Sequence, residues 1–130
     1  MAAKRFLRVL VVDDERPIRE VVAEALREAG HEVEAARNGA EALEVSLGWR
    51  PDVIVLDLMM PVLNASGFVR QLRLNPTSAE VPIVLLTAAY EPHAHAQSLG
   101  ASACLTKPFE LEDLLAAVEQ AATSQVTSSR

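Results

Sequence analysis

The stretch PDVIVLDLMMP (residues 51–61) places a run of branched apolar residues, Val53 to Leu56, directly before an aspartate, Asp57. Such a run is typical of a strand that is covered on both faces. A carboxylate at the end of a buried strand costs free energy unless other groups interact with it. The rest of the chain must therefore supply partners for Asp57.

The composition indicates a single globular domain. The chain has 130 residues, and half of them are hydrophobic, which is enough for a sizeable core. Acidic residues outnumber basic ones by 18 to 12, and no cluster of lysine and arginine with interleaved aromatics suggests a surface for nucleic acid. We therefore expect no direct binding to nucleic acid.

The N-terminus and the cysteine content bear on location. Basic residues precede the first apolar run, as in a signal peptide, but the run is short and ends in Asp13 and Asp14. No apolar stretch is long enough to span a membrane. The single cysteine, Cys104, excludes an internal disulfide and fits a reducing compartment. We expect a cytoplasmic protein with no membrane contact.

Short apolar runs alternate with segments of helical periodicity along the chain. Short apolar runs predict strands over 6–12, 53–57, 82–87 and 102–106, and alternating apolar residues predict a strand over 31–36. Apolar spacing and turn residues predict helices over 17–29, 40–49, 68–74, 92–99 and 111–121. The last residues, 124–130, form a polar tail that we expect to fray, so the expected domain is 1–123.

Five strand–helix units predict an α/β fold, a doubly wound five-stranded parallel sheet with helices on both faces. Ligands of such sheets bind beyond the carboxyl ends of the strands, near the position where the strand order reverses. The side chains that the prediction brings to this edge are Asp13, Asp14, Asp57, Thr87 and Lys107. Three carboxylates, a hydroxyl and an ammonium are therefore expected at one edge of the sheet.

Four motifs of the chain resemble those of the receiver domain of bacterial two-component response regulators. They read VLVVDDE, DVIVLDLMMP, VLLTA and CLTKPF, in the family's order and at about its spacing. Any one of them is weak evidence, because an apolar strand that ends in aspartate is common, but the four together are specific. The resemblance covers roughly residues 6–122 and implies the flavodoxin-like strand order 2-1-3-4-5.

The resemblance implies a phosphorylation-activated switch that receives its signal from a sensor histidine kinase or a phosphotransfer protein. Asp57 would attack the phosphoryl group of the donor's phosphohistidine and form an acyl phosphate. Asp14, Asp57 and the main-chain carbonyl of Met59 would bind Mg²⁺, or Mn²⁺, directly, and Asp13 would act on it largely through water; the cation screens the clustered charges. The protein would be a phosphoacceptor that promotes its own phosphorylation and dephosphorylation, and not an enzyme.

Further residues take roles from the same resemblance. Lys107 and Thr87 would contact phosphoryl oxygens, and the small Ala88 would leave room for the donor's imidazole. The peptide bond between Lys107 and Pro108 would be cis. The family's output surface implies that the fourth helix, fifth strand and fifth helix meet a downstream protein or an attached effector domain.

The chain departs from the family pattern in two places. The loop from Pro61 to Gly67 is two residues longer than usual. Cys104 stands where the family carries an aromatic residue that moves when Thr87 moves, and cysteine is too small to fill the same space. We therefore interpret Tyr90, three residues past Thr87, as a substitute switch residue; an ordinary surface tyrosine is the alternative interpretation.

Simpler interpretations exist for each residue alone. Asp13 and Asp14 could cap the following helix, because acidic residues favour helix N-termini. Thr87 could be an ordinary strand end and Lys107 a solvated surface residue. None of these interpretations explains why the other groups converge on Asp57.

Two other functions stay open. An aspartyl-nucleophile phosphatase usually has a second acid two residues after the nucleophile, but Met59 occupies that position and cannot transfer a proton. A degenerate receiver could bind proteins without being phosphorylated; Cys104 and the longer loop favour this alternative, whereas the intact acidic and basic residues oppose it.

Overall fold

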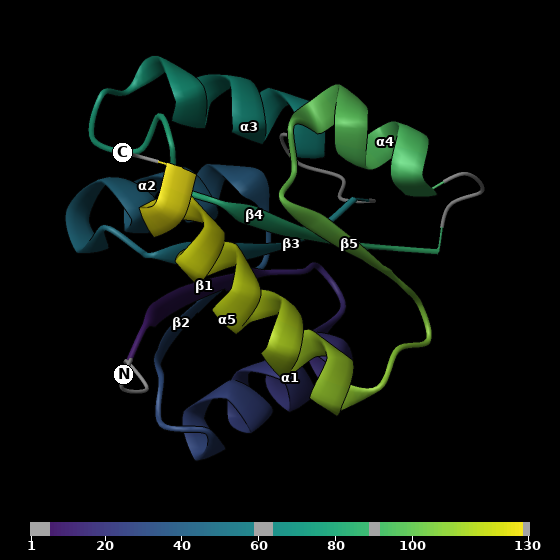
Figure 1. Cartoon of the computed structure of the whole chain (residues 1–130). Helices are drawn as coiled ribbons and strands as arrows, with labels where there is room; N and C mark the ends of the chain where they lie inside the picture. The colour runs from purple at the N-terminus through teal and green to yellow at the C-terminus, as the bar shows by residue number, and fades with distance from the viewer. Residues whose placement is uncertain (1–5, 59–63, 89–91, 129–130) are drawn as a thin grey trace.

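The computed structural model of the chain describes residues 6–58, 64–88 and 92–128. Strands and helices alternate through this part of the chain (Figure 1). The strands are β1 (Arg8–Val12), β2 (Glu32–Ala36), β3 (Val53–Asp57), β4 (Ile83–Thr87) and β5 (Ala103–Thr106). The helices are α1 (Arg16–Glu28), α2 (Gly39–Trp49), α3 (Ala65–Leu74), α4 (Pro92–Leu99) and α5 (Leu111–Ser128).

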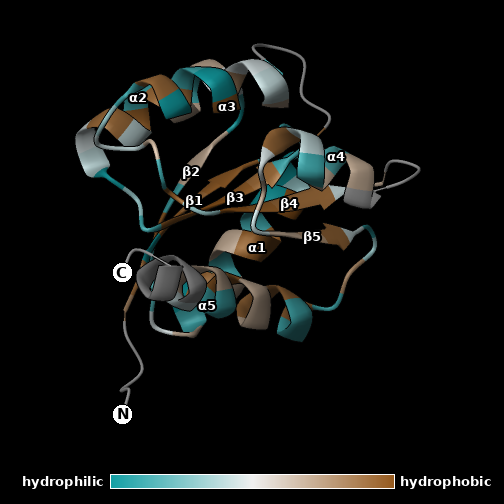
Figure 2. Ribbon diagram, turned by 45° about the horizontal axis from the view of Figure 1, so that its top comes forward, coloured by the Kyte–Doolittle hydropathy of each residue, from teal (hydrophilic) through white to brown (hydrophobic). Residues whose placement is uncertain are grey.

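The strands form one parallel sheet in the order β2-β1-β3-β4-β5, which confirms the predicted fold and strand order. Helices α1 and α5 cover one face of the sheet, and α2, α3 and α4 cover the other (Figure 1). Figure 2 shows the central strands as a largely hydrophobic layer between helices that carry both hydrophobic and hydrophilic residues. No helix in the described ranges is long and apolar enough to cross a membrane.

The central strands β3 and β4 are buried along their whole length. Successive side chains of a strand point to opposite faces, so alternate residues enter different cores. Val53 and Val55 pack with α1 and α5, whereas Ile54 and Leu56 pack with α2, α3 and α4. The run that precedes Asp57 is therefore apolar throughout because both of its faces are covered.

Two helix limits differ from the prediction by more than one residue. Helix α3 begins at Ala65, before the predicted residue 68, because the Asn64 side chain accepts a 2.9 Å hydrogen bond from the Gly67 N–H and caps the helix. Helix α5 continues to Ser128, past the last residue that apolar spacing marked, Ala121. Ala122, the first residue past this limit, also packs against the core on the side of α1 and α5.

Helix α1 ends in a Schellman motif that requires a glycine. The N–H of Gly30 donates to the carbonyl of Arg27 at 2.9 Å, and the N–H of His31 donates to the carbonyl of Leu26 at 3.1 Å. Gly30 has a φ of +101°, and a Cβ at this position would lie 2.9 Å from the Phe6 ring. The turn that leads into β2 therefore depends on this glycine.

Replacing Gly30 with alanine should lower the free energy of unfolding by about 1 to 2 kcal/mol, because alanine is strained in the left-handed region. Gly48 provides the matched control. It lies in α2 with no atom within 4 Å of an added Cβ, so Gly48→Ala should raise the free energy of unfolding by about 0.5 to 1 kcal/mol. Urea denaturation measures both variants, and equal effects would contradict the assigned role of Gly30.

Candidate functional site

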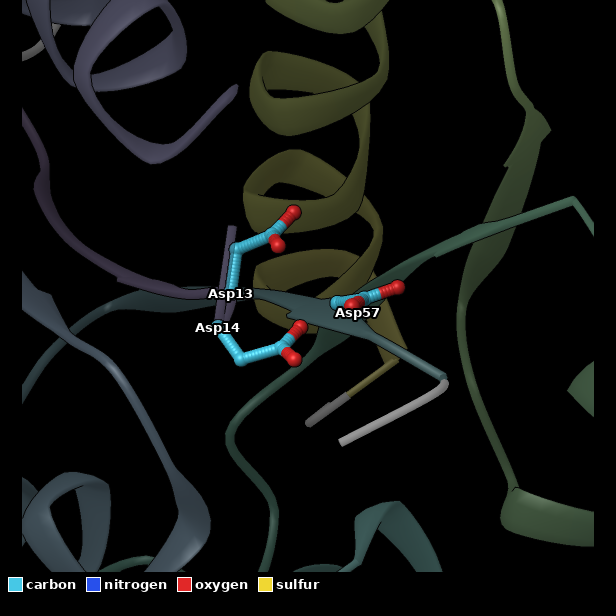
Figure 3. Close-up of side chains that lie close together, drawn as sticks. All are labelled: Asp13, Asp14 and Asp57. Carbon is cyan, nitrogen blue, oxygen red and sulfur yellow. The ribbon is translucent and has the colours of Figure 1, made fainter. Parts of the chain in front are cut away.

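Three aspartates lie together at the carboxyl edge of the sheet. Asp13 and Asp14 follow β1, and Asp57 is the last residue of β3, the strand paired with β1. One carboxylate oxygen from each residue lies within 4.8 Å of the other two (Figure 3). The strand order reverses between β1 and β3, where parallel sheets of this type bind ligands. We call these three residues the acidic cluster.

Asp13 is completely buried, and its two carboxylate oxygens differ in their contacts. Oδ1 accepts a 2.9 Å hydrogen bond from the Glu15 N–H. Oδ2 is also buried, and no group in the described ranges donates a hydrogen bond to it. Burial raises the pKa of Asp13 above its ordinary value, although the Glu15 N–H and the Lys107 charge act in the opposite direction.

The Lys107 ammonium brings a positive charge to the acidic cluster. Its Nζ lies 3.1 Å from Asp57 Oδ1, 3.6 Å from Asp13 Oδ2 and 3.7 Å from Glu15 Oε1. Burial disfavours the charged ammonium, but the hydrogen bond to Asp57 and the three carboxylate charges outweigh it, so the pKa of Lys107 lies above its ordinary value. The Lys107 backbone N–H donates to the Thr87 carbonyl at 2.8 Å, and the Lys107–Pro108 bond is cis, as predicted.

The ends of β3 and β4 bring Thr87 to the same edge. Asp57 pairs in register with Leu86, the residue before Thr87. Thr87 is fully buried at the end of β4, and the following Ala88 is exposed. The structure therefore gathers Asp13, Asp14, Asp57, Thr87 and Lys107 at one edge of the sheet, as the sequence predicted.

The simple capping interpretation of the two N-terminal aspartates is wrong. The N-cap of α1 is Glu15, and its side chain makes no capping hydrogen bond. Asp13 lies two residues before this N-cap, directly after β1, and is completely buried. Its carboxylate therefore belongs to the acidic cluster.

The remaining predicted positions divide into two groups. Cys104 lies in β5, partly buried, and packs against the core on the side of α2, α3 and α4. Its register partner is Leu85, so it lies two residues short of the strand end that faces the acidic cluster. Met59 and Tyr90 lie outside the described residues. Their predicted roles as metal ligand and switch residue stay predictions.

The acidic cluster fits a hard divalent cation. Its donors are carboxylate oxygens, the ligands that Mg²⁺ prefers. The buried Asp13 Oδ2 carries a partial negative charge that the described protein groups leave without a hydrogen-bond donor, which a cation would compensate. Asp14 is exposed, so the cluster is open to solvent on one side.

Sequence reasoning missed two neighbours of the cluster. Glu15 reaches Lys107 with its carboxylate, and Arg19 Nη1 donates a 2.9 Å hydrogen bond to the main-chain carbonyl of Asp13. Glu15 could have been found from the sequence, because it is the third consecutive acid of the DDE motif. Arg19 follows Glu15 by about one helical turn, but no sequence pattern identifies a backbone carbonyl as its acceptor.

An apolar groove opens beside Lys107. It has a volume of about 510 Å³ and lies between α1 and the segment that joins β5 to α5. Its lining includes Ile18, Val21, Phe109 and Leu111. Val21 belongs to the apolar spacing of α1 but is 53% exposed, because the groove above it is unfilled. A smaller depression next to it is lined by Val21 and Leu111 together with the acidic residues Glu20, Glu24 and Glu28.

Comparison with known proteins identifies relatives over most of the chain. The family described as "Response regulator receiver domain" matches residues 9–119. Response regulator MprA from Mycobacterium sp. (strain KMS) is 45% identical over 112 residues, which are 85% of this chain and 48% of that protein. The chain thus spans about half the length of the curated relatives that it matches.

Solved structures agree in fold and sequence. The chemotaxis response regulator CheY4 of Vibrio cholerae has a TM-score of 0.83 and 37% identity, and covers 90% of this chain and 99% of its own. The receiver domain of the Francisella response regulator 1452 has a TM-score of 0.81 and 30% identity. The match covers 91% of this chain and 98% of the Francisella chain. Together with the family match over residues 9–119, these likenesses show that the chain belongs to the response regulator receiver domains of two-component signalling systems.

Proposed function

We propose that this chain is a phosphorylation-activated switch whose phosphoacceptor is Asp57. The observation that carries the proposal is the Lys107 ammonium, 3.1 Å from Asp57 Oδ1, beside the carboxylates of Asp13 and Asp14. A structural ion pair needs one carboxylate for one lysine, whereas this edge has an excess of negative charge. The excess is explained if a cation and a phosphoryl group complete the site.

Asp57 acts as a nucleophile in this proposal. One of its oxygens attacks the phosphorus of a donor phosphohistidine, the new O–P bond forms as the N–P bond breaks, and the imidazole leaves with the electron pair of that bond. The product is an acyl phosphate on Asp57. Asp57 is 3% exposed, but it lies at the end of β3 beside the exposed Asp14, so a donor approaches from that side.

Asp13, Asp14 and Asp57 would hold Mg²⁺, with the main-chain carbonyl of Met59 as the further ligand that the family resemblance implies; Mn²⁺ has the same ligand preference. The bound cation would supply charge compensation for the carboxylates and the incoming phosphoryl oxygens. The protein's own contribution is to hold the three carboxylates within 4.8 Å of one another before the cation arrives.

Lys107 and Thr87 would bind the phosphoryl group. The Lys107 ammonium is shared among three carboxylates and would turn toward the phosphoryl oxygens once Asp57 carries them. The Thr87 hydroxyl, at the end of the neighbouring strand, would donate to another oxygen, and Ala88 leaves the approach open. The hydrogen bond from the Lys107 N–H to the Thr87 carbonyl would couple the responses of Lys107 and Thr87 to the phosphoryl group.

We propose that the phosphodonor, a histidine kinase or a phosphotransfer protein, binds in the apolar groove beside Lys107. Val21 and Leu111 are large apolar residues that are exposed on this surface. Glu20 and Glu24 lie next to them and would complement basic side chains of a donor helix. A donor seated here would lie next to Lys107 and the acidic cluster.

Output is proposed to pass through α4, β5 and α5. The strand β5 is at the edge of the sheet, and the residues Ala103, Cys104 and Leu105 are each partly exposed. The partner would be a downstream protein or an effector domain, since the curated relatives are about twice as long as the aligned region. We place residues 1–123 in the receiver domain and the protein in the cytoplasm as parts of this proposal.

Replacing Asp57 with asparagine should abolish labelling by acetyl phosphate in the presence of Mg²⁺, because the amide keeps the shape but loses the nucleophilic oxygen. Intact-mass spectrometry should show one added phosphoryl group on the wild-type chain and none on Asp57→Asn. Asp113→Asn, an exposed position in the first turn of α5, is the control and should be labelled normally. Equal labelling of Asp57→Asn and the wild type would refute the assignment, whereas no labelling of the wild type would favour a degenerate binding module.

Removing divalent cations with a chelator should stop the same reaction. Without a cation, the carboxylates of the acidic cluster repel both one another and the incoming phosphoryl group. Adding back Mg²⁺ or Mn²⁺ should restore labelling of the wild-type chain. Undiminished labelling in the chelator would exclude a cation from the reaction.

Placing a charge in the apolar groove should slow transfer from a protein phosphodonor without affecting labelling by a small-molecule phosphodonor. Val21→Arg should strongly slow transfer from any phosphorylated histidine kinase core that labels the wild type, because the arginine occupies the groove. It should leave labelling by acetyl phosphate unchanged. Leu47→Arg is the matched control, since Leu47 is 49% exposed on α2 and Val21 is 53% exposed on α1. If kinase transfer to Val21→Arg proceeds at the wild-type rate, the donor does not use this groove.

The lifetime of the acyl phosphate tests two residues that lie outside the described part of the chain. In the family, the positions two residues beyond the phosphoacceptor and the threonine flank the path of the hydrolytic water, and here they are Met59 and Ala89. Neither side chain orients water, so hydrolysis should be slow for a receiver. The double variant Met59→Asn with Ala89→Glu should lose its phosphoryl group several-fold faster in a time course. No acceleration would show that these positions do not control the water.

A further inference from the structure

Arg19 ties together both ends of the loop that carries the N-terminal acids. Its guanidinium Nη1 donates a 2.9 Å hydrogen bond to the main-chain carbonyl of Asp13. Its backbone N–H donates, also at 2.9 Å, to the main-chain carbonyl of Glu15. Asp14 is the residue between these two carbonyls. One residue of α1 therefore fixes the backbone on both sides of Asp14.

The loop needs such a restraint because of its charges. Asp13, Asp14 and Glu15 are consecutive acids, and Asp57 lies next to them. Mutual repulsion of these carboxylates favours a more open loop. The Arg19 guanidinium opposes this repulsion with its positive charge and with a hydrogen bond to a charge-free acceptor.

The position of the hydrogen bond is important for ligand binding. Arg19 bonds the carbonyl of Asp13 and leaves the buried Asp13 Oδ2 without a hydrogen-bond donor from the described part of the chain. A guanidinium that paired with the carboxylate itself would compete with a cation for that oxygen. The observed contact restrains the loop without such competition.

The restraint is also independent of Lys107. Lys107 Nζ lies 3.6 Å from Asp13 Oδ2 and 3.7 Å from Glu15 Oε1, so it attracts the loop as long as it stays there. In the proposed phosphorylated form, Lys107 turns to the phosphoryl oxygens and this attraction weakens. The hydrogen bond from Arg19 involves neither Lys107 nor a carboxylate, so it can persist.

We propose that Arg19 is a positioning residue of the cation site, which holds the backbone of Asp13–Glu15 so that the carboxylates of Asp13 and Asp14 face Asp57. This inference rests on the proposed cation site and adds a residue to it. Residues that orient metal ligands through hydrogen bonds commonly change metal affinity by about 10- to 100-fold when they are replaced. Arg19 would act in this way through the backbone of its ligand.

Loss of the Arg19 charge and loss of the restraint that Arg19 places on the loop predict opposite changes in Mg²⁺ affinity, which makes the inference testable. Removal of a positive charge near several carboxylates should by itself strengthen the binding of a cation. Loss of the restraint should instead weaken binding, because the cation must then order the loop. The sign of the change in Mg²⁺ affinity therefore distinguishes a positioning residue from a nearby charge.

The variant Arg19→Met keeps a long side chain of high helix propensity but removes the guanidinium. Arg27→Met is a matched control, because Arg27 Nη2 donates a 3.1 Å hydrogen bond to the main-chain carbonyl of Val33 near the other end of α1. Each variant removes one charge and one hydrogen bond to a carbonyl from the same helix. Isothermal titration of the whole chain with Mg²⁺ should show about tenfold weaker binding for Arg19→Met and unchanged binding for Arg27→Met.

A second measurement does not depend on the cation. In the metal-free protein, amide exchange at the Glu15 N–H, which donates to Asp13 Oδ1, should be faster in Arg19→Met and unchanged in Arg27→Met. Arg19→Lys retains the charge and a donor on a different geometry, and its Mg²⁺ affinity should lie between those of Arg19→Met and the wild type. This conservative variant also decides the matter if Arg19→Met does not fold.

The possible failures are distinguishable. If the wild-type chain binds no Mg²⁺, the proposed cation site is wrong and the role of Arg19 falls with it. If the wild type binds Mg²⁺ but Arg19→Met binds it equally well or more tightly, only the role of Arg19 is wrong. Equal losses of affinity in Arg19→Met and Arg27→Met would also overturn it, because the effect would then come from α1 as a whole.

Discussion

The attraction between the Lys107 ammonium and two buried carboxylates is the interaction on which the site depends. Asp13 and Asp57 are almost completely buried at the ends of neighbouring strands, where each charge is costly without a partner. Lys107 Nζ lies 3.1 Å from Asp57 Oδ1 and 3.6 Å from Asp13 Oδ2. One ammonium cannot neutralise these carboxylates together with Asp14 and Glu15, so the edge keeps an excess of negative charge. This unbalanced arrangement suits a site that receives a cation and then exchanges an ion pair for a phosphoryl contact.

The fold makes this arrangement possible by separating rigid parts from adaptable ones. Strands β3 and β4 are buried on both faces and fix the positions of Asp57 and Thr87. Lys107 follows the edge strand β5, whose residues are only partly buried, so its segment has fewer packing restraints. A tie from the Lys107 N–H to the Thr87 carbonyl connects the two parts. A change in the contacts of Lys107 can therefore be transmitted to the end of β4 and to the surface around β5.

Much of the fold and site could be predicted because strong local patterns agreed with one another. The continuous apolar run before Asp57 predicts a strand covered on both faces, and the four motifs place Asp57, Thr87 and Lys107 at one edge. Other features depend on tertiary contacts that have no pattern in the sequence. Arg19 bonds a backbone carbonyl, and every residue has one. Val21 fits the apolar spacing of α1, but spacing cannot tell whether a neighbouring element covers it.

The central claim is that this edge of the sheet makes Asp57 a phosphoacceptor, and locating the modified residue tests it most directly. Borohydride reduces an acyl phosphate on aspartate to homoserine, which peptide mass spectrometry can place in the sequence. After treatment with acetyl phosphate and Mg²⁺, the account predicts this conversion at Asp57 and at no other aspartate, and none when Mg²⁺ is omitted. Conversion at Asp13, Asp14 or a carboxylate elsewhere, or no conversion in the complete reaction, would contradict it.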